Sequence, residues 1–400
     1  MKYEIILFQE YLRSHILGFG KKLKKSKFKL LTKEESTKKL YQRIPSFEKE
    51  IKRRKTNKIL WIRRILGIPN VRVKFMKEGD LFFTYGCLLF TNKPYCVYLE
   101  NGLSPYRYDL VISKNPIARM LTSFLIRRKQ CKKLIFMSKT AQKSFLSSVK
   151  YSPKTIRAIK EKSEQCYPLM TTQDSQDPKK ASGEKLRILF AGTFYIKGGI
   201  EVVNAFEQLK KTYPNLELTI ITQEMTLKKE DLERIKSIDG ISLFNAAFNA
   251  EQMNNFYREH DIFVIPTYRD SFGAILIEVL PFGMPIITTD QYATTEVAID
   301  GYNGFVYPNH PLKDYDTETF QMFNKYFNPE NFYAALFKFQ EEGKMKPVES
   351  FIYKSIEKFI KKPELVEEFS KNSIELYKKK FHYDLISSRI ESILLDAIEK

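Results

Sequence analysis

Cysteine, histidine and tryptophan are scarce in this 400-residue chain, and their scarcity excludes several classes of protein. The four cysteines are scattered without a C-x-x-C pair, so neither a zinc site nor a disulfide framework is indicated and a reducing cytosol is the expected compartment. The four histidines are equally dispersed, so the sequence predicts no metal cluster. No apolar run approaches the ~18 residues of a membrane-spanning helix. The N-terminus has an acidic residue on each side of a short apolar run, unlike a signal peptide. A cytoplasmic protein is expected, either soluble or peripheral on the inner face of the cell membrane.

Acidic residues are also rare in the first half of the chain. Residues 1–180 hold 41 Lys or Arg against 14 Asp or Glu, a net charge of +27, whereas residues 181–400 have a net charge of −7. This asymmetry points to an anionic partner for the first half. A nucleic-acid-binding protein is one alternative. It would need aromatic residues interleaved with Lys and Arg on a recognisable module, and none is readable, so a nucleic-acid partner is not expected.

The second candidate for that anionic partner is a membrane. Residues 47–66 form a basic, partly amphipathic segment that contains Trp61, the only tryptophan of the chain. Interfacial membrane helices combine basic residues with Trp and Leu in this way. Residues 21–66 are therefore predicted to contact an anionic membrane surface. The alternative is a helix docked on its own domain with a solvated basic face.

Short apolar runs alternate with helical patterns along most of the chain. This alternation predicts βαβ units and parallel sheets, hence an α/β fold. Residues 171–184 lack apolar periodicity and are rich in helix and strand breakers. They are therefore predicted to be the linker between two domains. The chain is thus expected to consist of a domain at 1–170, the linker, a second domain at 185–362 and a C-terminal helical segment at 363–400. Strands are expected at residues 3–8, 80–85, 95–99, 134–137, 186–191, 216–222, 241–244 and 263–265.

The most informative stretch, residues 261–289, reads as strand, loop, helix and strand. Asp270 lies in the loop, and the helix that opens after Ser271 is apolar from Ala274 to Leu280 except at Glu278. A carboxylate in so apolar a helix is costly to bury unless something hydrogen-bonds to it. The alternative is a helix end that leans into solvent.

The spacing of the two acids suits a nucleotide sugar. Eight residues of helix would rise about 12 Å, at ~1.5 Å per residue. Between the acids, the helix N-terminus would offer free amides at Phe272, Gly273 and Ala274. Such amides form an anion site, and Gly273 would let a ligand approach the backbone closely. Together, the acids and the anion site would match sugar, diphosphate and ribose.

This stretch resembles the signature of retaining GT-B-fold glycosyltransferases, glycosyltransferase family 4. In that family two acids flank seven residues, with Phe-Gly near the first acid and a Gly-x-Pro run downstream, as at Gly283 here. Residues 294–308, which include a Gly-x-Asn-Gly segment, continue the pattern. The resemblance implies that Asp270 lies by the donor sugar as a catalytic residue and that Glu278 binds the ribose hydroxyls. The family usually has Glu where this chain has Asp270, which is one methylene shorter.

A second segment, just after the linker, resembles the same family. A strand is followed by Gly192, Thr193 and then Lys197-Gly198, where relatives have Gly-Arg and later Lys-Gly. The resemblance implies that Lys197 binds the donor diphosphate and acts in catalysis, while Thr193 replaces one expected cation. The predicted donor-binding residues are Gly192, Thr193, Gly198, Ser271, Phe272, Gly273, Ala274 and Glu278.

The acceptor side is less defined. Glu100 and Asn101 fall just past the expected carboxyl end of a strand, where open α/β sheets bind their ligands. They are the acceptor-side candidates, and an ordinary turn is the alternative.

The resemblance implies a GT-B fold, in which two Rossmann-like domains have parallel sheets facing a cleft and the C-terminal helix crosses back to the first domain. It also implies a retaining transfer from a UDP- or GDP-sugar to a glycan or lipid-linked acceptor, in cell-surface polysaccharide or glycolipid biosynthesis. Lys197 and the amides at 272–274 would stabilise the leaving diphosphate. No Asp-x-Asp motif follows a strand, so neither a metal nor another cofactor is expected. The departures at Thr193 and Asp270 point to one alternative, a non-catalytic relative that binds a nucleotide sugar or carbohydrate.

Overall fold

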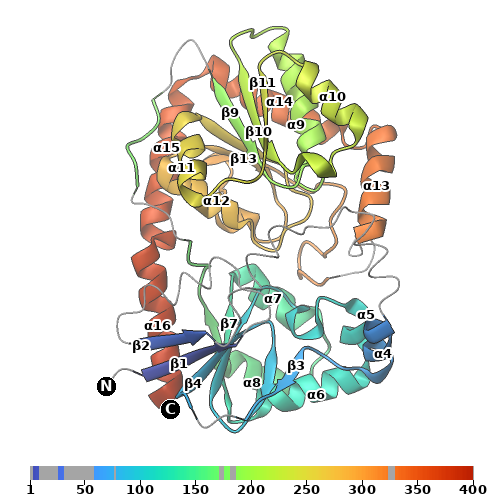
Figure 1. The fold of residues 1–400 in the computed structure, drawn as a ribbon, viewed down its shortest axis with the longest axis vertical. Helices are drawn as coiled ribbons and strands as arrows, with labels where there is room; N and C mark the ends of the chain where they lie inside the picture. Colours follow the sequence, from blue (N-terminus) through green and yellow to red (C-terminus); the bar gives the residue numbers. More distant parts are fainter. Residues whose placement is uncertain are drawn as a thin grey trace. The chain divides into compact units, whose positions relative to one another are not determined.

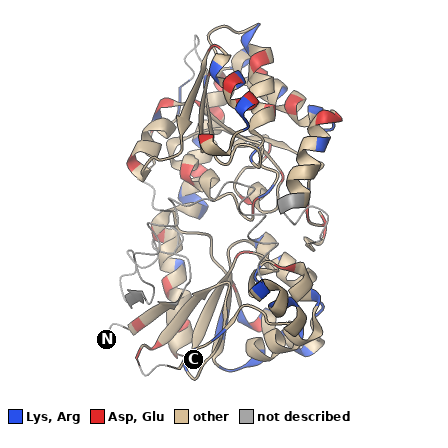
Figure 2. Cartoon of the chain, turned by 45° about the vertical axis from the view of Figure 1, so that its right-hand side comes forward, with Lys and Arg blue, Asp and Glu red and all other residues tan. Residues whose placement is uncertain are grey.

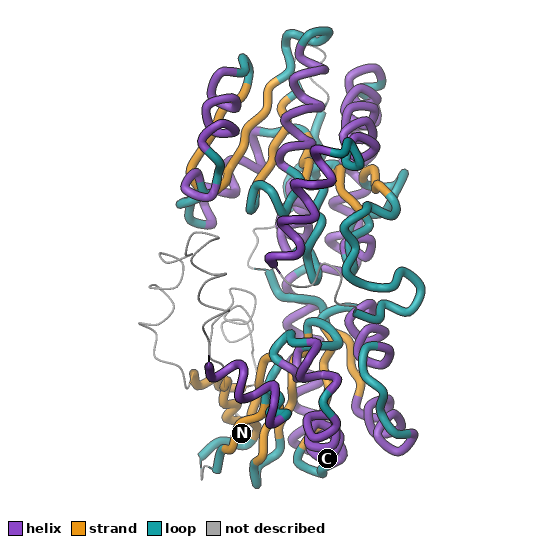
Figure 3. Tube along the Cα trace, turned by 90° about the vertical axis from the view of Figure 1, so that its right-hand side faces the viewer, coloured by secondary structure: helices purple, strands orange, loops and turns teal. Residues whose placement is uncertain are grey.

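A computed structural model describes residues 3–8, 26–30, 58–75, 78–170, 175–180, 186–322 and 329–399. The chain divides into two compact units. The first consists of Met1–Thr171, Asp314–Phe327 and Phe381–Lys400, and the second of Thr172–Lys313 and Asn328–Lys380. Each unit contains a six-stranded parallel sheet with helices on both faces (Figures 1 and 3). The expected α/β fold with two Rossmann-like parallel sheets is confirmed.

The sheet of the first unit has the order β2-β1-β4-β6-β7-β8. Its strands are β1 (Tyr3–Phe8), β2 (Ser26–Leu30), β4 (Leu81–Tyr85), β6 (Tyr95–Leu99), β7 (Cys131–Phe136) and β8 (Ser163–Gln165). A separate parallel pair joins β3 (Val71–Val73) to β5 (Leu88–Phe90). The described helices are α4 (Lys58–Leu66), α5 (Leu110–Lys114), α6 (Pro116–Arg127), α7 (Lys139–Ser147), α8 (Pro153–Lys162) and α16 (Tyr383–Glu399).

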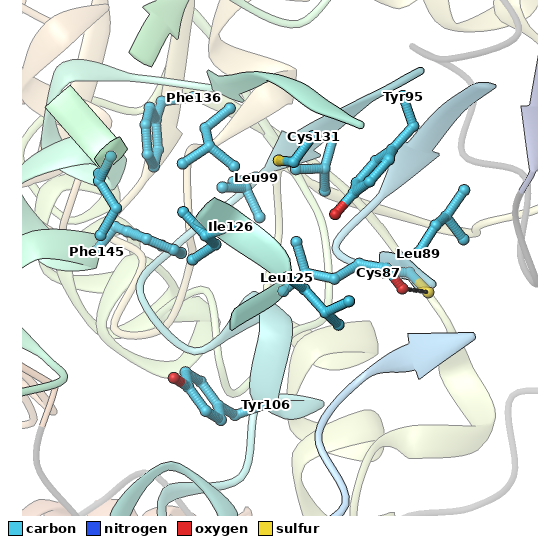
Figure 4. Packing of buried hydrophobic residues seen from close by; sticks show 14 of the residues in the cluster. Cys87, Leu89, Tyr95, Leu99, Tyr106, Leu125, Ile126, Cys131, Phe136 and Phe145 are labelled. Atoms are coloured by element: carbon cyan, nitrogen blue, oxygen red, sulfur yellow. Dashed lines mark hydrogen bonds between the residues drawn. The ribbon is translucent and has the colours of Figure 1, made fainter. Parts of the chain in front are cut away.

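The core of the first unit forms between this sheet and α6. Leu125 and Ile126 of α6 are fully buried in one cluster with Leu99 of β6 and Phe136 of β7, and Figure 4 shows these side chains. Helix α6 starts where the sequence favours a helix, since the Asn115 side chain accepts a hydrogen bond from the Ile117 amide and Pro116 occupies the first turn. The four cysteines are buried as free thiols.

The sheet of the second unit has the order β11-β10-β9-β12-β13-β14. Its strands are β9 (Arg187–Ala191), β10 (Glu217–Thr222), β11 (Ile241–Asn245), β12 (Ile262–Ile265), β13 (Ile286–Thr289) and β14 (Gly304–Tyr307). Its helices are α9 (Gly199–Lys210), α10 (Lys229–Ser237), α11 (Ala250–Glu259), α12 (Ala274–Val279), α13 (Pro329–Glu341), α14 (Lys346–Lys361) and α15 (Glu364–Leu376). In chain order the strands run 3-2-1-4-5-6, the doubly wound arrangement whose direction reverses between β9 and β12.

The C-terminal part of the chain is divided between the two units. Helix α15 belongs to the second unit, where Ser370 Oγ accepts a hydrogen bond from the Lys179 amide at 2.7 Å. A turn of π-helix at Tyr377–Phe381 follows, and α16 then packs against β4, β6 and β7 of the first unit. The expected return of the last helix to the first domain is confirmed.

No helix within the described ranges is both long enough and apolar enough to span a membrane. Of the segment 21–66, which was predicted to contact a membrane, the structure describes 26–30 and 58–66. Residues 21–25 and 31–57 lie outside the described residues.

Candidate functional site

Two loops meet beyond the carboxyl ends of β9 and β12, where the strand order of the second sheet reverses. The first loop runs from Gly192 to Gly198 and the second from Pro266 to Gly273. Ligands of doubly wound sheets bind at this reversal, because the loops of the two central strands diverge there. All the predicted donor-binding residues except Ala274 and Glu278 therefore lie in loops at the position that the topology favours.

Close contact between the two loops requires Gly198. Its φ is +74°, in the left-handed region, and a Cβ atom there would lie 2.6 Å from Pro266 Cγ and 2.7 Å from the Pro266 carbonyl oxygen. Any larger residue would push the loops apart. The Tyr268 amide also donates to the Ile196 carbonyl at 3.0 Å, which fixes one loop against the other.

The two predicted catalytic residues, Lys197 and Asp270, form an ion pair across these loops. The Lys197 ammonium also donates to Thr267 Oγ1 at 3.1 Å and to the Arg269 carbonyl at 3.3 Å. Only 16% of the Lys197 side chain and 20% of the Asp270 side chain are exposed. The structure thus brings together two residues that are 73 positions apart in the sequence.

Asp270 binds the backbone amides that were expected to receive a ligand. Its Oδ1 accepts hydrogen bonds from the Phe272 amide at 3.1 Å and from the Gly273 amide at 2.9 Å. Burial by itself would raise the pKa of Asp270, but the Lys197 charge, its hydrogen bond and these two amides together hold the pKa below its usual value. The expectation that the Phe272 and Gly273 amides are open to an anion is therefore wrong for this structure.

The expected continuous helix between the two acids is also wrong. Helix α12 begins only at Ala274, and Gly273 before it has a φ of +77°. The Asp270 side chain shapes residues 271–273 into a turn, since Asp commonly binds the amides two and three positions ahead. Helical geometry therefore covers only part of the spacing between Asp270 and Glu278.

Glu278 is partly buried in α12 and has a hydroxyl donor. The Tyr257 hydroxyl, from α11, donates to Glu278 Oε2 at 3.0 Å. Burial raises the pKa of Glu278, and the hydrogen bond from Tyr257 offsets part of that rise. Burying a carboxylate without a hydrogen bond would be costly, and the Tyr257 hydroxyl provides that hydrogen bond.

The remaining predicted donor-binding residues differ in their exposure. Thr193, at the position where relatives have Arg, is exposed, and its carbonyl accepts a hydrogen bond from the Lys197 amide at 3.0 Å. Gly192 lies beside Lys197, because a Cβ atom at Gly192 would be 3.0 Å from Lys197 Cγ. Ser271 and Ala274 are half-buried at the start of α12.

A group of buried polar residues beside this site was not predicted from the sequence. Glu201, Tyr268, Gln291 and His310 are at most 5% exposed, and Gln291 Nε2 donates to the Asp270 carbonyl at 3.4 Å. His310 Nε2 lies 2.6 Å from Gln291 Oε1. Burial, and then the charge of Lys313, lowers the pKa of His310 to about 3. The criterion that singled out Glu278, an acid within an apolar helix, would also have found Glu201.

Glu201 is the buried acid of this group. Its Oε1 accepts a hydrogen bond from Gln340 Nε2 at 2.9 Å. The Tyr268 hydroxyl is buried beside this carboxylate and interacts with it. Burial raises the pKa of Glu201, and hydrogen bonding to Gln340 opposes that rise. The first turn of α9, which follows the Lys197 loop, thus contains an acid held in an apolar setting.

The acceptor-side candidates lie in the first unit, after β6. Asn101 Oδ1 accepts a hydrogen bond from the Leu103 amide at 2.9 Å, so Asn101 stabilises its own turn, as the alternative interpretation expected. The Glu100 carboxylate accepts hydrogen bonds from the Tyr108 hydroxyl at 3.0 Å and from Tyr85. Each candidate is only 6% exposed. In this structure both are buried in their own loop.

Residues 172–317 match the family described as Glycosyl transferases group 1. The match covers the second unit from Thr172 to Lys313. Lys197, Asp270 and Glu278 all lie within the matched residues.

Curated relatives match only part of the chain. A D-inositol 3-phosphate glycosyltransferase of an Arthrobacter species is 28% identical over 137 residues, which is 33% of this chain and 32% of the relative. A phosphatidyl-myo-inositol mannosyltransferase of Propionibacterium freudenreichii is 30% identical over 137 residues, 34% of this chain and 32% of the relative. The matched region therefore spans about a third of each of these relatives.

Solved structures match over a greater length. The Anabaena protein HepE, in complex with UDP and glucose, has a TM-score of 0.57 at 12% identity and covers 98% of this chain and 100% of its own. The pneumococcal O-GlcNAc transferase GtfA, in complex with UDP and GlcNAc, has a TM-score of 0.51 at 14% identity, over 80% of this chain and 57% of its own. At these identities the likeness shows the fold alone, and that fold is the GT-B fold implied by the resemblance to glycosyltransferase family 4.

Proposed function

We propose that this chain is a retaining glycosyltransferase that moves a sugar from a UDP- or GDP-sugar to a glycan or lipid-linked acceptor. The observation that carries the proposal is the Lys197–Asp270 pair at the reversal of strand order in the group 1 domain. A donor diphosphate brings negative charge to that point, where it would compete with the Asp270 carboxylate for the Lys197 ammonium. The incoming diphosphate would replace the Asp270 carboxylate as the partner of the Lys197 ammonium.

In this proposal Lys197 and Asp270 act on opposite charges. The leaving diphosphate gains negative charge as the glycosidic bond breaks, and Lys197 would stabilise it more strongly then than in the ground state. The sugar ring gains positive charge at the same time, and Asp270 would face it. Glu278 would bind the ribose, a part of the donor that does not react. Because Lys197 provides the cation, the proposed reaction uses no metal, and EDTA should leave turnover unchanged.

The acceptor and the location are also part of the proposal. We infer an acceptor in cell-surface polysaccharide or glycolipid synthesis, made available on the inner face of the cell membrane. The net charge of +27 in residues 1–180 supports binding of the enzyme to an anionic membrane surface. Glu100 and Asn101 remain acceptor-side candidates only if their loop opens, since both are buried as it stands.

The test begins with calorimetry of the full chain with UDP, GDP and ADP, followed by NMR of sugar released from the preferred donor. The proposal expects tight binding of UDP or GDP and a product with the anomeric configuration of the donor. Nucleotide binding without any transfer or hydrolysis would favour the non-catalytic relative. Release of the opposite anomer would overturn the retaining assignment but leave the transferase assignment intact.

A further inference from the structure

Helix α4 of the first unit turns its apolar side away from the protein. None of its residues is buried, and Trp61 is 65% exposed. Amphipathic helices of soluble domains normally face their apolar side inward, because burial of that side stabilises them. The exposed apolar residues of α4 are Ile59, Trp61, Ile62, Ile65 and Leu66.

The polar side of α4 fixes this orientation. Arg64 Nε pairs with Asp109 Oδ2 at 2.8 Å, at the start of α5. Asn115, between α5 and α6, donates from Nδ2 to the Arg64 and Ile65 carbonyls at 3.2 and 3.4 Å. Leu60 alone among the apolar residues of α4 packs on the core of the unit. Because these contacts join α4 to two other helices, its outward face is a fixed part of the surface.

Helix α6 extends the same kind of surface. Ile117, Met120 and Phe124 are exposed, and their spacing of three and four residues places them on one side of the helix. The other side of α6 is buried in the core. The Arg128 guanidinium lies over the Phe124 ring at 5.7 Å and over the Phe90 ring at 4.5 Å.

Residues 73–75 add further exposed apolar side chains to those of α4 and α6. The ring of Phe75 meets the edge of Phe90 with centroids 6.0 Å apart, and both Val73 and Phe75 are exposed. We call the whole set the α4–α6 face: Ile59, Trp61, Ile62, Ile65, Leu66, Val73, Phe75, Ile117, Met120 and Phe124. Ten exposed large apolar residues on three segments of one unit depart from the single, scattered exposures of an ordinary surface.

The segments that form the α4–α6 face are basic, and Asp109, just before α5, is paired with Arg64. Residues 58–75 and 110–130 hold ten Lys or Arg and no Asp or Glu. Figure 2 shows Lys and Arg along these helices in the first unit. A second copy of the chain would bring an equally basic surface against this one, and the repulsion would oppose pairing. An anionic bilayer offers both negative headgroups and an apolar layer directly beneath them.

We propose that the α4–α6 face docks on the surface of an anionic lipid bilayer. Trp61, Met120 and Phe124 enter the boundary between headgroups and acyl chains, while the surrounding Lys and Arg pair with lipid phosphates. This deepens the peripheral location in the proposed function. It also replaces a prediction about one sequence segment, 21–66, with a surface built from three parts of the first unit. Docking needs no transfer activity, so either proposal can fail without the other.

Docking can be followed by the fluorescence of Trp61, because it is the only tryptophan of the chain. The full chain is mixed with vesicles of phosphatidylcholine alone or with 30 mol % phosphatidylglycerol, and bound protein is separated by flotation. Binding to the anionic vesicles should be at least tenfold stronger and should fall in 0.5 M NaCl. Trp61 emission should shift to the blue and be quenched by lipids brominated on the acyl chain. Binding without quenching would show that other basic residues hold the membrane and would overturn the assignment of this face.

Met120→Glu has a close control in Met225→Glu. Met120 is 68% exposed on the α4–α6 face, and Met225 is 71% exposed in the second unit. Met120→Glu should weaken binding to anionic vesicles about tenfold and Met225→Glu should leave it unchanged, while UDP or GDP affinity stays the same in both as a check on folding. Equal binding by the two variants would contradict the proposal. So would a dimer in sedimentation that Met120→Glu dissociates, because the face would then be a protein interface.

Discussion

The donor-site loops of the second unit and the α4–α6 face of the first unit depart from the usual distribution of side chains in opposite directions. In the second unit, charged and polar groups lie inside: Lys197 and Asp270 are mostly covered and Glu201 is 1% exposed. In the first unit, large apolar groups lie outside, on α4 and α6. Both arrangements cost stability relative to an ordinary core and surface. A feature that costs stability and is held by specific contacts is where a functional role is expected.

The two departures also differ in how they are held. The buried charges are held by hydrogen bonds from two loops, so each group depends on its neighbours. The exposed apolar residues are held only through the backbone and the polar side of their helices. Substitutions in the second unit should therefore have large, coupled effects. Those on the α4–α6 face should barely alter the free energy of unfolding.

The largest effect on turnover is expected for Asp270→Asn. The substituted side chain can still accept from the Phe272 and Gly273 amides, but it loses the charge that would face the reacting sugar. Turnover at saturating donor should fall about a hundredfold, which is ~2.7 kcal/mol in the barrier. Nucleotide affinity measured by calorimetry should change much less. Full turnover in this variant would show that Asp270 serves only the local structure.

Lys197→Met should show how far the buried charges depend on one another. Removing one partner of a mostly buried ion pair leaves Asp270 uncompensated, and such a loss costs about 3 kcal/mol in unfolding free energy. The pKa of Asp270 is lowered in the folded state, so its stabilisation is present above its unfolded pKa and is lost as pH falls through the folded one. Without Lys197 the folded pKa rises, and acid unfolding should start at a higher pH.

Two comparisons test whether Lys197 acts on the diphosphate as well. The exposed Lys211, just past the end of α9, provides the control variant Lys211→Met, which should unfold in acid as the unchanged chain does. Lys197→Met should weaken UDP or GDP binding far more than uridine or guanosine binding, because only the nucleotides carry the charge that Lys197 would pair with. Equal losses for nucleotide and nucleoside would indicate general damage to the domain.

Glu278→Gln should act on donor binding. If the carboxylate accepts from the ribose hydroxyls, loss of its charge should weaken nucleotide affinity by about 1–3 kcal/mol, with turnover at saturating donor retained. Calorimetry and saturating kinetics on the same preparation separate the two quantities. A variant that loses turnover while keeping its affinity would reverse the proposed roles of Glu278 and Asp270.

Glu201→Gln tests the buried acid with a pH profile. Burial raises the pKa of Glu201, so the cost of ionising it is absent below its unfolded pKa and grows as pH rises above that value. The neutral amide carries no such cost. The variant should match the unchanged chain near pH 4 and be more stable at pH 7, by about 1 kcal/mol. Thermal unfolding over that range measures the difference, and parallel curves would show that burial of the acid carries no cost.

The smallest effect is expected on the α4–α6 face, from two positions in one helix. Met120→Ala removes an exposed side chain and should change unfolding free energy by less than about 0.5 kcal/mol. Leu125→Ala, at a fully buried position of α6, should cost about 3 kcal/mol because it leaves a cavity. Urea unfolding of both variants gives the comparison. A large loss for Met120→Ala would mean that this face is already covered within the chain.

Strand positions could be read from the sequence because they depend on short-range chemistry. The apolar run Phe263 to Ile265 predicted a buried parallel strand, and β12 spans Ile262–Ile265. The spacing of Asp270 and Glu278, together with the family resemblance around Lys197, predicted a donor site within residues that match the group 1 family. These features are local, and their residue types alone carry the signal.

Contacts between distant residues were decided by the tertiary structure. The sequence placed Lys197 and Asp270 in separate motifs, and only the strand order, with β9 beside β12, brings them together. The carboxylate of Asp270 fills the amide site because loop geometry, rather than helix propensity, sets residues 271–273. The outward apolar side of α4 depends on Asp109 and Asn115, about 50 residues away. The sequence by itself determined strands with continuous apolar runs, such as β12, and it marked Asp270 and Glu278 as unusual acids. The direction each unusual residue faces was decided by partners that only the folded chain brings near.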